Sequence, residues 1–127
     1  MRRTRLIAAG FAAAMTIMAA GPALAGYGAL AYDESTGKYG LSSNEETQTK
    51  ADDVATKECG GDKCKIVFRT AAKQCGAIAM VGEAKGPNPA WGAGKHGNRA
   101  QAELAAVTNC QKHTKSQCKI RSVECNR

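Results

Sequence analysis

Six cysteines carry the clearest chemistry in this 127-residue sequence, because a thiol can form a disulfide, bind a metal or act as a nucleophile. They are Cys59, Cys64, Cys75, Cys110, Cys118 and Cys125. Their number is even, and a predicted export signal precedes them, a combination typical of a disulfide framework. We therefore expect three disulfides.

The spacing of Cys59 and Cys64 raises one catalytic alternative, a thiol–disulfide exchange site. Such sites favour two cysteines separated by two residues at the N-terminus of a helix, where the helix dipole stabilises a thiolate. Here four residues separate the cysteines, and Cys59 ends a predicted helix, where the dipole has the opposite sign. We interpret the pair as a structural bridge.

The two histidines, His96 and His113, are the other candidates for metal binding. Together with Cys110 and Cys118 they would suggest zinc, but their spacing fits no zinc motif and exported cysteines are usually oxidised. Neighbouring acidic residues in the first predicted helix diverge, so they form no acid–base pair. The sequence assigns no catalytic residue, metal ligand or cofactor, and we do not expect an enzyme.

Residues 82–97 are the stretch that we single out for recognition. They include five glycines, two prolines and the only tryptophan of the chain. Long loops beside an exposed aromatic residue often carry binding. The candidate recognition residues are Lys85, Trp91, Lys95 and His96. The alternative is that Trp91 is a core strand residue and that the loop is merely long.

Residues 1–25 are typical of a secretory signal peptide. Three arginines precede an apolar run from residue 6 to residue 20, and Ala23-Leu24-Ala25 is a small-x-small cleavage site. The apolar run is shorter than the ~20 residues that span a bilayer. We expect cleavage after Ala25, export to the periplasm or the cell exterior, and no membrane span.

The remaining residues, 26–127, are expected to form a single disulfide-rich domain. They carry 15 basic and 11 acidic side chains, and residues 75–127 hold eight of the basic but three of the acidic ones. We expect an unknown protein or anionic partner to meet this basic half first. Aromatic residues are not interleaved with the basic ones, so we do not expect nucleic-acid binding.

Two internal repeats, residues 26–74 and 75–127, are predicted from matching blocks. Residues 27–31 (YGALA) match 75–79 (CGAIA), and Tyr39-Gly40 matches Trp91-Gly92. Each unit reads as strand, strand, helix, strand. We therefore expect an α+β fold in which the strands form an antiparallel sheet with two helices on one face.

The helix boundaries follow from capping signals. Ser43 with Glu46 predicts the start of the first helix, and Gly60-Gly61 its end. Asn98 predicts the start of the second helix. We expect that helix to turn Ala100, Leu104 and Val107 toward the sheet, with Ala102 and Ala106 flanking them.

The repeat also predicts the disulfide pairing. Cys59 and Cys64 hold the same two places in the first unit as Cys110 and Cys118 hold in the second. Two equivalent local bridges are the simplest solution, and they leave Cys75 to bond Cys125.

Taken in order, these blocks resemble domain of unknown function 4189, a family of small exported bacterial proteins. The resemblance rests on residues 27–32, 59–67 and 75–79, Trp91-Gly92, the alanine-rich second helix and Cys125-Asn126. It implies the exported compartment and the α+β unit, and it implies no catalytic residues. The loop 82–89 is longer than the family pattern leads us to expect.

The function that we expect is a non-enzymatic binding or interaction module. An inhibitor or immunity protein that acts on a secreted enzyme through the basic half is one alternative. A small periplasmic hydrolase or redox enzyme is another. The sequence makes no prediction of the oligomeric state.

Overall fold

A computed structural model of the chain describes residues 26–82 and 89–127. The predicted signal peptide, residues 1–25, and the candidate recognition residue Lys85 therefore lie outside the described residues. None of the helices in the described part of the chain is long and apolar enough to cross a membrane.

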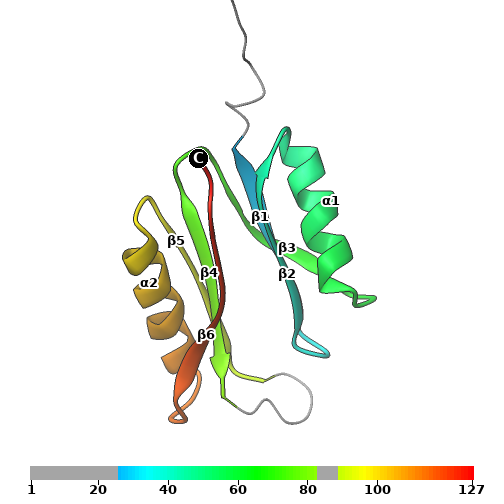
Figure 1. The fold of residues 1–127 in the computed structure, drawn as a ribbon. Coiled ribbons are helices and arrows are strands. Elements are labelled where there is room, and N and C mark those ends of the chain that lie inside the picture. Colours follow the sequence, from blue (N-terminus) through cyan, green and yellow to red (C-terminus); the bar gives the residue numbers. More distant parts are fainter. Residues whose placement is uncertain (1–25, 83–88) are drawn as a thin grey trace, which may run out of the picture.

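The two halves of the chain contain the same order of elements (Figure 1). The first half consists of β1 (Tyr27–Asp33), β2 (Lys38–Glu45), α1 (Gln48–Cys59) and β3 (Lys65–Thr70). The second consists of β4 (Cys75–Val81), β5 (Trp91–His96), α2 (Arg99–Gln111) and β6 (Cys118–Cys125). The α+β fold and the strand–strand–helix–strand order of each half agree with the prediction.

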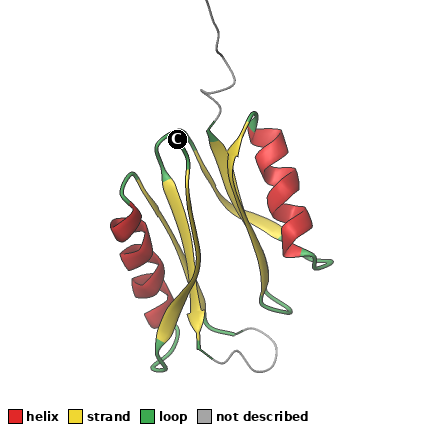
Figure 2. Ribbon diagram, in the orientation of Figure 1, coloured by secondary structure: helices red, strands yellow, loops and turns green. Residues whose placement is uncertain are grey.

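The strands form two antiparallel sheets of three strands, in the orders β2-β1-β3 and β5-β4-β6. The sequence predicted one sheet with both helices on one face, and the observed arrangement differs in this respect. The two sheets pack against each other, and each helix covers the outer face of its own sheet (Figure 2). The molecule is thus a four-layer α/β/β/α sandwich.

The central strands explain these layers, because small and large side chains alternate along them. In β1, Ala29 and Ala31 face α1, whereas Leu30 faces the opposite sheet. In β4, Ala77 faces α2 and Ile78 faces the opposite sheet. Large residues on the inner faces need a second sheet to cover them, which a single sheet with helices on one face would not supply.

The helices lie very close to the strands beside them, because glycine occupies the contact points. A Cβ atom at Gly40 would lie 2.1 Å from the backbone oxygen of Ala55 in α1, and one at Gly92 would lie 2.1 Å from the backbone nitrogen of Cys110 in α2. Such an approach also demands small residues on the helix. The small residues Ala102 and Ala106 are accordingly buried in α2.

The predicted face of α2 was therefore wrong for Ala100 and Leu104, whereas Val107 is half-buried and packs against the core between α2 and its sheet. Leu104 is 58% exposed, and Ala100 is also exposed, while the alanines expected at the flanks form the contact. The close approach to Gly92 and Gly94 leaves no room for a leucine between helix and sheet.

The start of α1 also differs from the prediction. Ser43 lies within β2, and the N-cap is Thr47, whose hydroxyl accepts a hydrogen bond from the backbone N–H of Lys50 at 3.0 Å. Strand β2 extends to Glu45, where it pairs with Tyr27 at the start of β1. The predicted caps Asn98 and Gly60 are confirmed, since Asn98 accepts from Gln101 N–H and Gly60 adopts a left-handed conformation with φ 71°.

The three disulfides are those that the repeat predicted: Cys59–Cys64, Cys110–Cys118 and Cys75–Cys125. The first two join the end of each helix to the following strand or to the residue before it. The third joins residues directly opposite each other in β4 and β6, with Cα atoms 3.9 Å apart. Each bridge thus fixes one end of a helix or a strand pair.

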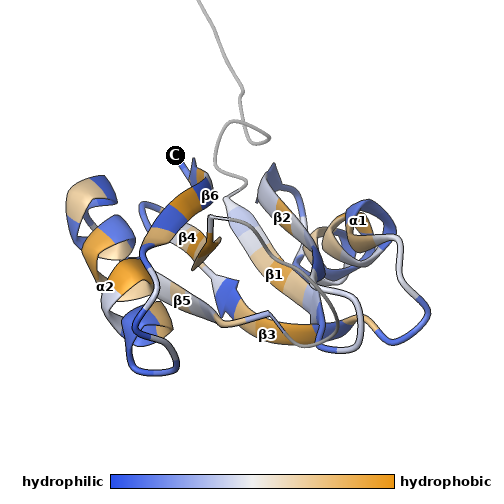
Figure 3. Ribbon diagram, turned by 90° about the horizontal axis from the view of Figure 1, so that it is seen from below, coloured by the Kyte–Doolittle hydropathy of each residue, from blue (hydrophilic) through white to orange (hydrophobic). Residues whose placement is uncertain are grey.

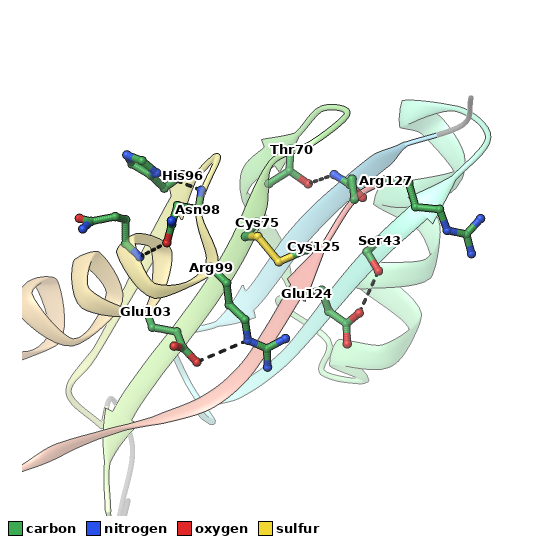
Figure 4. The surroundings of a disulfide bond; sticks show 12 residues. Ser43, Thr70, Cys75, His96, Asn98, Arg99, Glu103, Glu124, Cys125 and Arg127 are labelled. Atoms are coloured by element: carbon green, nitrogen blue, oxygen red, sulfur yellow. Dashed lines mark hydrogen bonds and ion pairs between the residues drawn. A yellow bond between two sulfur atoms is a disulfide. The ribbon is translucent and has the colours of Figure 1, made fainter. Parts of the chain in front are cut away.

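One side of the sandwich is closed where the edge strands β2 and β6 meet (Figure 3). Ser43 of β2 donates a hydrogen bond to Glu124 of β6, close to the Cys75–Cys125 bridge (Figure 4). Asn126, which follows β6 and is only 7% exposed, accepts from the backbone N–H of Asn44 and donates to Thr70 and Ala71. This asparagine ties the end of the second sheet to both edge strands of the first.

Candidate functional site

The opposite side of the sandwich, where β3 and β5 are the edge strands, is more open. Lys95 donates one hydrogen bond across it, to the backbone oxygen of Arg69. Two cavities of about 580 and 890 Å³ lie along this side, and both are lined by Glu34, Val67 and Trp91. We call the two cavities together the Trp91 groove.

The groove is built by three segments that are distant in sequence. Strand β3 contributes Val67, which is 41% exposed although it is apolar. The turn after β1 contributes Glu34, and the start of β5 contributes Trp91. Val67 lies where the pairing of β3 with β1 shifts its register, because Leu30 pairs with Phe68 and the next residue of β1 pairs with Ile66, so Val67 has no partner residue in β1.

The aromatic centre of the groove is a stacked pair. The rings of Tyr32 and Trp91 lie with their centroids 4.1 Å apart and their planes 21° apart. Tyr32 comes from the first sheet and Trp91 from the second, so the pair joins the two inner faces. Trp91 is half-buried and therefore belongs partly to the core and partly to the surface.

The hydroxyl group of Tyr32 is the unusual atom of this site. The residue is 2% exposed, and the hydroxyl has no hydrogen-bond partner within residues 26–82 and 89–127. Burial, followed by the charges of Glu34 and Asp33, raises the pKa of Tyr32 to about 12. The phenol is thus neutral at physiological pH. A buried hydroxyl without a partner costs about 1–3 kcal/mol, which makes it a candidate contact for a ligand.

Asp33, beside Tyr32, is already engaged by the protein. Its carboxylate accepts hydrogen bonds from the hydroxyl and backbone N–H of Ser35, and from the backbone N–H of Lys63. These hydrogen bonds, that of the Ser35 hydroxyl above all, lower the pKa of Asp33, although burial opposes them. The residue is 1% exposed and remains charged, so it places a fixed negative charge beside the groove.

The structure separates the predicted recognition residues. Trp91 lines the groove, at the start of β5. Lys95 and His96 lie at the other end of that strand, where Lys95 bonds to Arg69 O and His96 Nδ1 accepts from the backbone N–H of Asn98. Neither of these two lines a groove cavity. Of the three described candidates, Trp91 is therefore the one that lines the groove, and the fourth, Lys85, lies outside the described residues.

Of the two histidines, His113 lines the smaller cavity, near the end of α2. Among the described residues, no group of three or more His, Cys, Asp or Glu side chains is placed to hold a metal ion. A bidentate ion pair between Arg69 and Asp52 joins β3 to α1 outside the groove.

Tyr32 and Glu34 were missed by reasoning from the sequence. Alternation along residues 27–32 does place Tyr32 on the same face as Leu30, opposite the alanines. That signal would have placed the ring in an apolar layer. The contact with Trp91 depends on how two sheets pack, which no local pattern records.

Comparison with known proteins identifies a family that this chain resembles. The family described as Domain of unknown function (DUF4189) matches residues 27–125. Two curated relatives are the uncharacterized proteins Rv1813c of Mycobacterium tuberculosis and Mb1843c of Mycobacterium bovis. Each is 39% identical over 61 residues, which are 48% of this chain and 41% of the relative. The chain thus matches less than half the length of these relatives.

The NMR structure of Rv1813c from Mycobacterium tuberculosis is similar to this fold. Its TM-score is 0.58 at 31% sequence identity, over 80% of this chain and 76% of the other. The matched family region contains Tyr32, Trp91 and all six cysteines. Because it also covers every strand and helix of the described structure, the chain belongs to the DUF4189 family.

Proposed function

We propose that this protein is an exported, disulfide-stabilised binding module that recognises its partner in the Trp91 groove. The observation that carries the proposal concerns Tyr32, which lines the larger cavity of the groove and whose buried hydroxyl has no partner among the described residues. A ligand that forms a hydrogen bond with this hydroxyl would offset the free-energy cost of burying it without a partner.

The shape of the site supports binding over catalysis. A half-buried tryptophan, an exposed valine and a few polar groups line the groove, as is common in recognition sites. Val67 and Trp91 come from strands of the two packed sheets, so this part of the walls is held in place before a partner arrives. A site that is ordered before binding loses little conformational entropy when the partner binds, which favours affinity.

Export is part of the proposal and rests on the disulfides and on the signal pattern. Three disulfides occupy all six cysteines, and such bonds persist in oxidising compartments. Amino-terminal sequencing of protein recovered from outside the cytoplasm should begin at Gly26. A sequence that begins at Met1 would contradict the export step.

The binding function is tested by retention of a partner from the exported fraction on immobilised protein. We expect the wild-type protein to retain one protein at a stoichiometric level and Trp91→Phe to lose most of it. Leu104→Ala is the matched control, because Leu104 is an exposed apolar residue on α2, outside the groove. Equal retention by the wild type and Trp91→Phe would overturn the groove as the binding site.

The inhibitor or immunity role is favoured by a separate observation. Lys112, Lys115 and Lys119 of the basic half are all exposed, so they are accessible to an acidic enzyme. Reversal of these three charges should weaken such a complex far more than reversal of Lys38, Lys50 and Lys57, which are also exposed. Equal effects would mean that the charge asymmetry has no role in binding.

A further inference from the structure

We propose that the loop between α2 and β6 inhibits a trypsin-like serine protease, with Lys115 as the side chain that enters the specificity pocket of the enzyme. This inference rests on the inhibitor role described above and names the class of the enzyme. The loop consists of residues 112–117, and the disulfide Cys110–Cys118 closes it. Figure 1 shows it beyond the last turn of α2, at the end of the molecule away from the C-terminus.

The internal repeat shows that this loop is longer than the fold requires. In the first half, the disulfide Cys59–Cys64 makes the same connection, from the end of α1 to the residue before β3, and its cysteines are 5 positions apart. The cysteines of the second half are 8 positions apart, three more than in the first. Because the shorter connection is enough to join a helix to a strand, the added residues are available for another role.

The loop is held in one conformation by Gln111, the last residue of α2. Its Nε2 donates hydrogen bonds to the carbonyl oxygens of Ser116 at 2.8 Å and Thr114 at 3.3 Å. Its Oε1 accepts from the backbone N–H of Cys118 at 2.8 Å, and the hydroxyl of Thr114 accepts from the backbone N–H of Ser116 at 3.0 Å. These bonds and the disulfide fix the backbone on both sides of Lys115. Such preorganisation raises the affinity of a loop for its partner, because less freedom is lost on binding.

Lys115 is the basic residue at the centre of this fixed segment. Its side chain is exposed, as is that of Ser116, while Thr114 is half-buried. Lys115 lines neither cavity of the Trp91 groove, although His113, earlier in the loop, lines the smaller one. The lysine is therefore accessible to a second protein on a surface next to the groove and distinct from it.

The chemistry of this lysine selects the class of partner. The specificity pocket of trypsin contains a carboxylate, so it accepts a basic side chain. The sequence from Leu104 to Val123 contains no acidic residue, so nothing in this stretch repels that carboxylate. Exposed lysines alone would suit many acidic surfaces. One lysine on a loop that is fixed on both sides suits a pocket that takes one basic side chain.

The disulfide favours an inhibitor over a substrate. Exposed loops are preferred sites of proteolysis, and an enzyme that binds Lys115 would hydrolyse the peptide bond between Lys115 and Ser116. Water adds across that bond, leaving a carboxylate on Lys115 and an amino group on Ser116. The Cys110–Cys118 bridge and the hydrogen bond from Gln111 to Ser116 hold the two new ends together. The enzyme can therefore reseal the bond with release of the same water, and the loop stays bound.

The test measures inhibition of trypsin by the whole disulfide-bonded protein, with a small arginine anilide as the reporter substrate. Chymotrypsin, whose pocket is hydrophobic, is assayed in parallel with a phenylalanine anilide. We expect the wild-type protein to inhibit trypsin and to leave chymotrypsin active. Lys115→Ala should weaken the inhibition about 100-fold or more, as for a central residue of an interface. Lys115→Arg should retain it.

Three further variants assign the effect to the loop. Lys115→Leu should lose the inhibition of trypsin and gain inhibition of chymotrypsin, because the leucine suits the hydrophobic pocket. Gln111→Ala should weaken the inhibition about tenfold and should make cleavage after Lys115 faster, because the loop is then less ordered. Lys112→Ala is the matched control: Lys112 is exposed but directly follows α2, and its loss should change the inhibition less than about threefold.

The possible outcomes separate this inference from the proposed function. Rapid, complete cleavage after Lys115 without inhibition would make the loop a substrate and overturn the inference. The absence of inhibition at micromolar protein, or inhibition that Lys115→Ala leaves intact, would also overturn it. Loss of inhibition in Trp91→Phe but not in Lys115→Ala would assign the effect to the groove instead. Retention of a partner in the Trp91 groove and the charge-reversal experiment would still decide the proposed function.

Discussion

Tyr32 and Trp91 stack with their ring centroids 4.1 Å apart, although they belong to different sheets and are separated by 59 positions in the chain. The contact fixes the distance between the inner faces at one end of the sandwich. Tyr32 also lines the larger cavity, and no described group bonds to its buried hydroxyl. The packing of the two sheets and the candidate binding site therefore depend on the same pair of rings.

The Tyr32→Phe variant should be more stable than the wild type when no ligand is bound. The substitution keeps the stacked ring and removes a buried hydroxyl without a described partner, so unfolding should cost about 1–2 kcal/mol more. Urea denaturation at pH 8 measures this difference. A less stable variant would show that the hydroxyl serves the fold and would remove the main support for the site.

The same variant should differ from the wild type in alkaline solution. The pKa of Tyr32 is about 12 in the folded protein, against 10.0 for the free side chain. The unfolded chain therefore loses this proton first, and stability falls as the pH rises from about 10 to 12. Tyr32→Phe should lack this part of the fall, so the stability gap between the two proteins should widen between pH 9 and pH 11. A constant gap would contradict the raised pKa.

Alanine at Gly40 or Gly92 should destabilise the protein strongly. The added Cβ would meet backbone atoms of α1 or α2 at 2.1 Å, and backbone cannot move aside as a side chain can. We expect a loss of about 3 kcal/mol or more, at the upper end of overpacking effects. Thermal unfolding measures it.

Gly97→Ala provides the control for the glycine variants, because a Cβ there would meet one atom at 3.8 Å. It should change stability by no more than about 0.5 kcal/mol. Equal effects at Gly97 and Gly92 would contradict the close packing of α2 on β5.

Much of the fold could be predicted from the sequence because its signals are local or repeated. The disulfide pairing followed from cysteines that hold matching places in the two repeats. The start of α2 followed from Asn98, whose side chain caps the helix locally. The start of α1 could not be predicted in the same way. Both Ser43 and Thr47 can cap a helix. Because β2 pairs with β1 as far as Glu45, Ser43 lies in a strand and Thr47 is the N-cap.

The exposed face of α2 and the binding site required non-local information. Leucine at position 104 would ordinarily mark the buried face of a helix, but the glycines of β5 bring the backbones so close that only alanine fits. Trp91 was singled out from the sequence, whereas Tyr32, which stacks on it, and Glu34, which lines the same cavities, were not. Their placement beside Trp91 depends on the packing of one sheet on the other, which the sequence pattern does not specify.

The Cys75–Cys125 bridge should contribute more stability than either of the other disulfides. Its cysteines are 50 positions apart, against 5 and 8 for the others, so it restricts the unfolded chain most. Chain entropy predicts about 4 kcal/mol for this bridge and about 2 kcal/mol for each short one. Denaturation of the paired Cys→Ser variants measures the ranking, and a larger loss for Cys110 and Cys118 would contradict it.

Asn126 should be the most important polar residue of the closed side. Its amide bonds to Asn44, Thr70 and Ala71, and replacement by alanine would remove these bonds from the buried Thr70, the half-buried Asn44 and the exposed Ala71. We expect Asn126→Ala to lose about 2–4 kcal/mol. Ser43→Ala removes an exposed hydrogen bond on the same side and should lose less than about 0.5 kcal/mol. Equal losses in a denaturation experiment would argue against Asn126 as the tie between the sheets.

The central claim is that a partner binds in the Trp91 groove, and the indole N–H resonance of Trp91 tests it most directly. The chain has one tryptophan, so a proton–nitrogen NMR spectrum contains one such signal. On addition of the protein retained from the exported fraction, we predict that this signal shifts or broadens together with the amides of Glu34 and Val67. An unchanged indole signal, with the changes confined to α2 or to the β2–β6 side, would contradict the account.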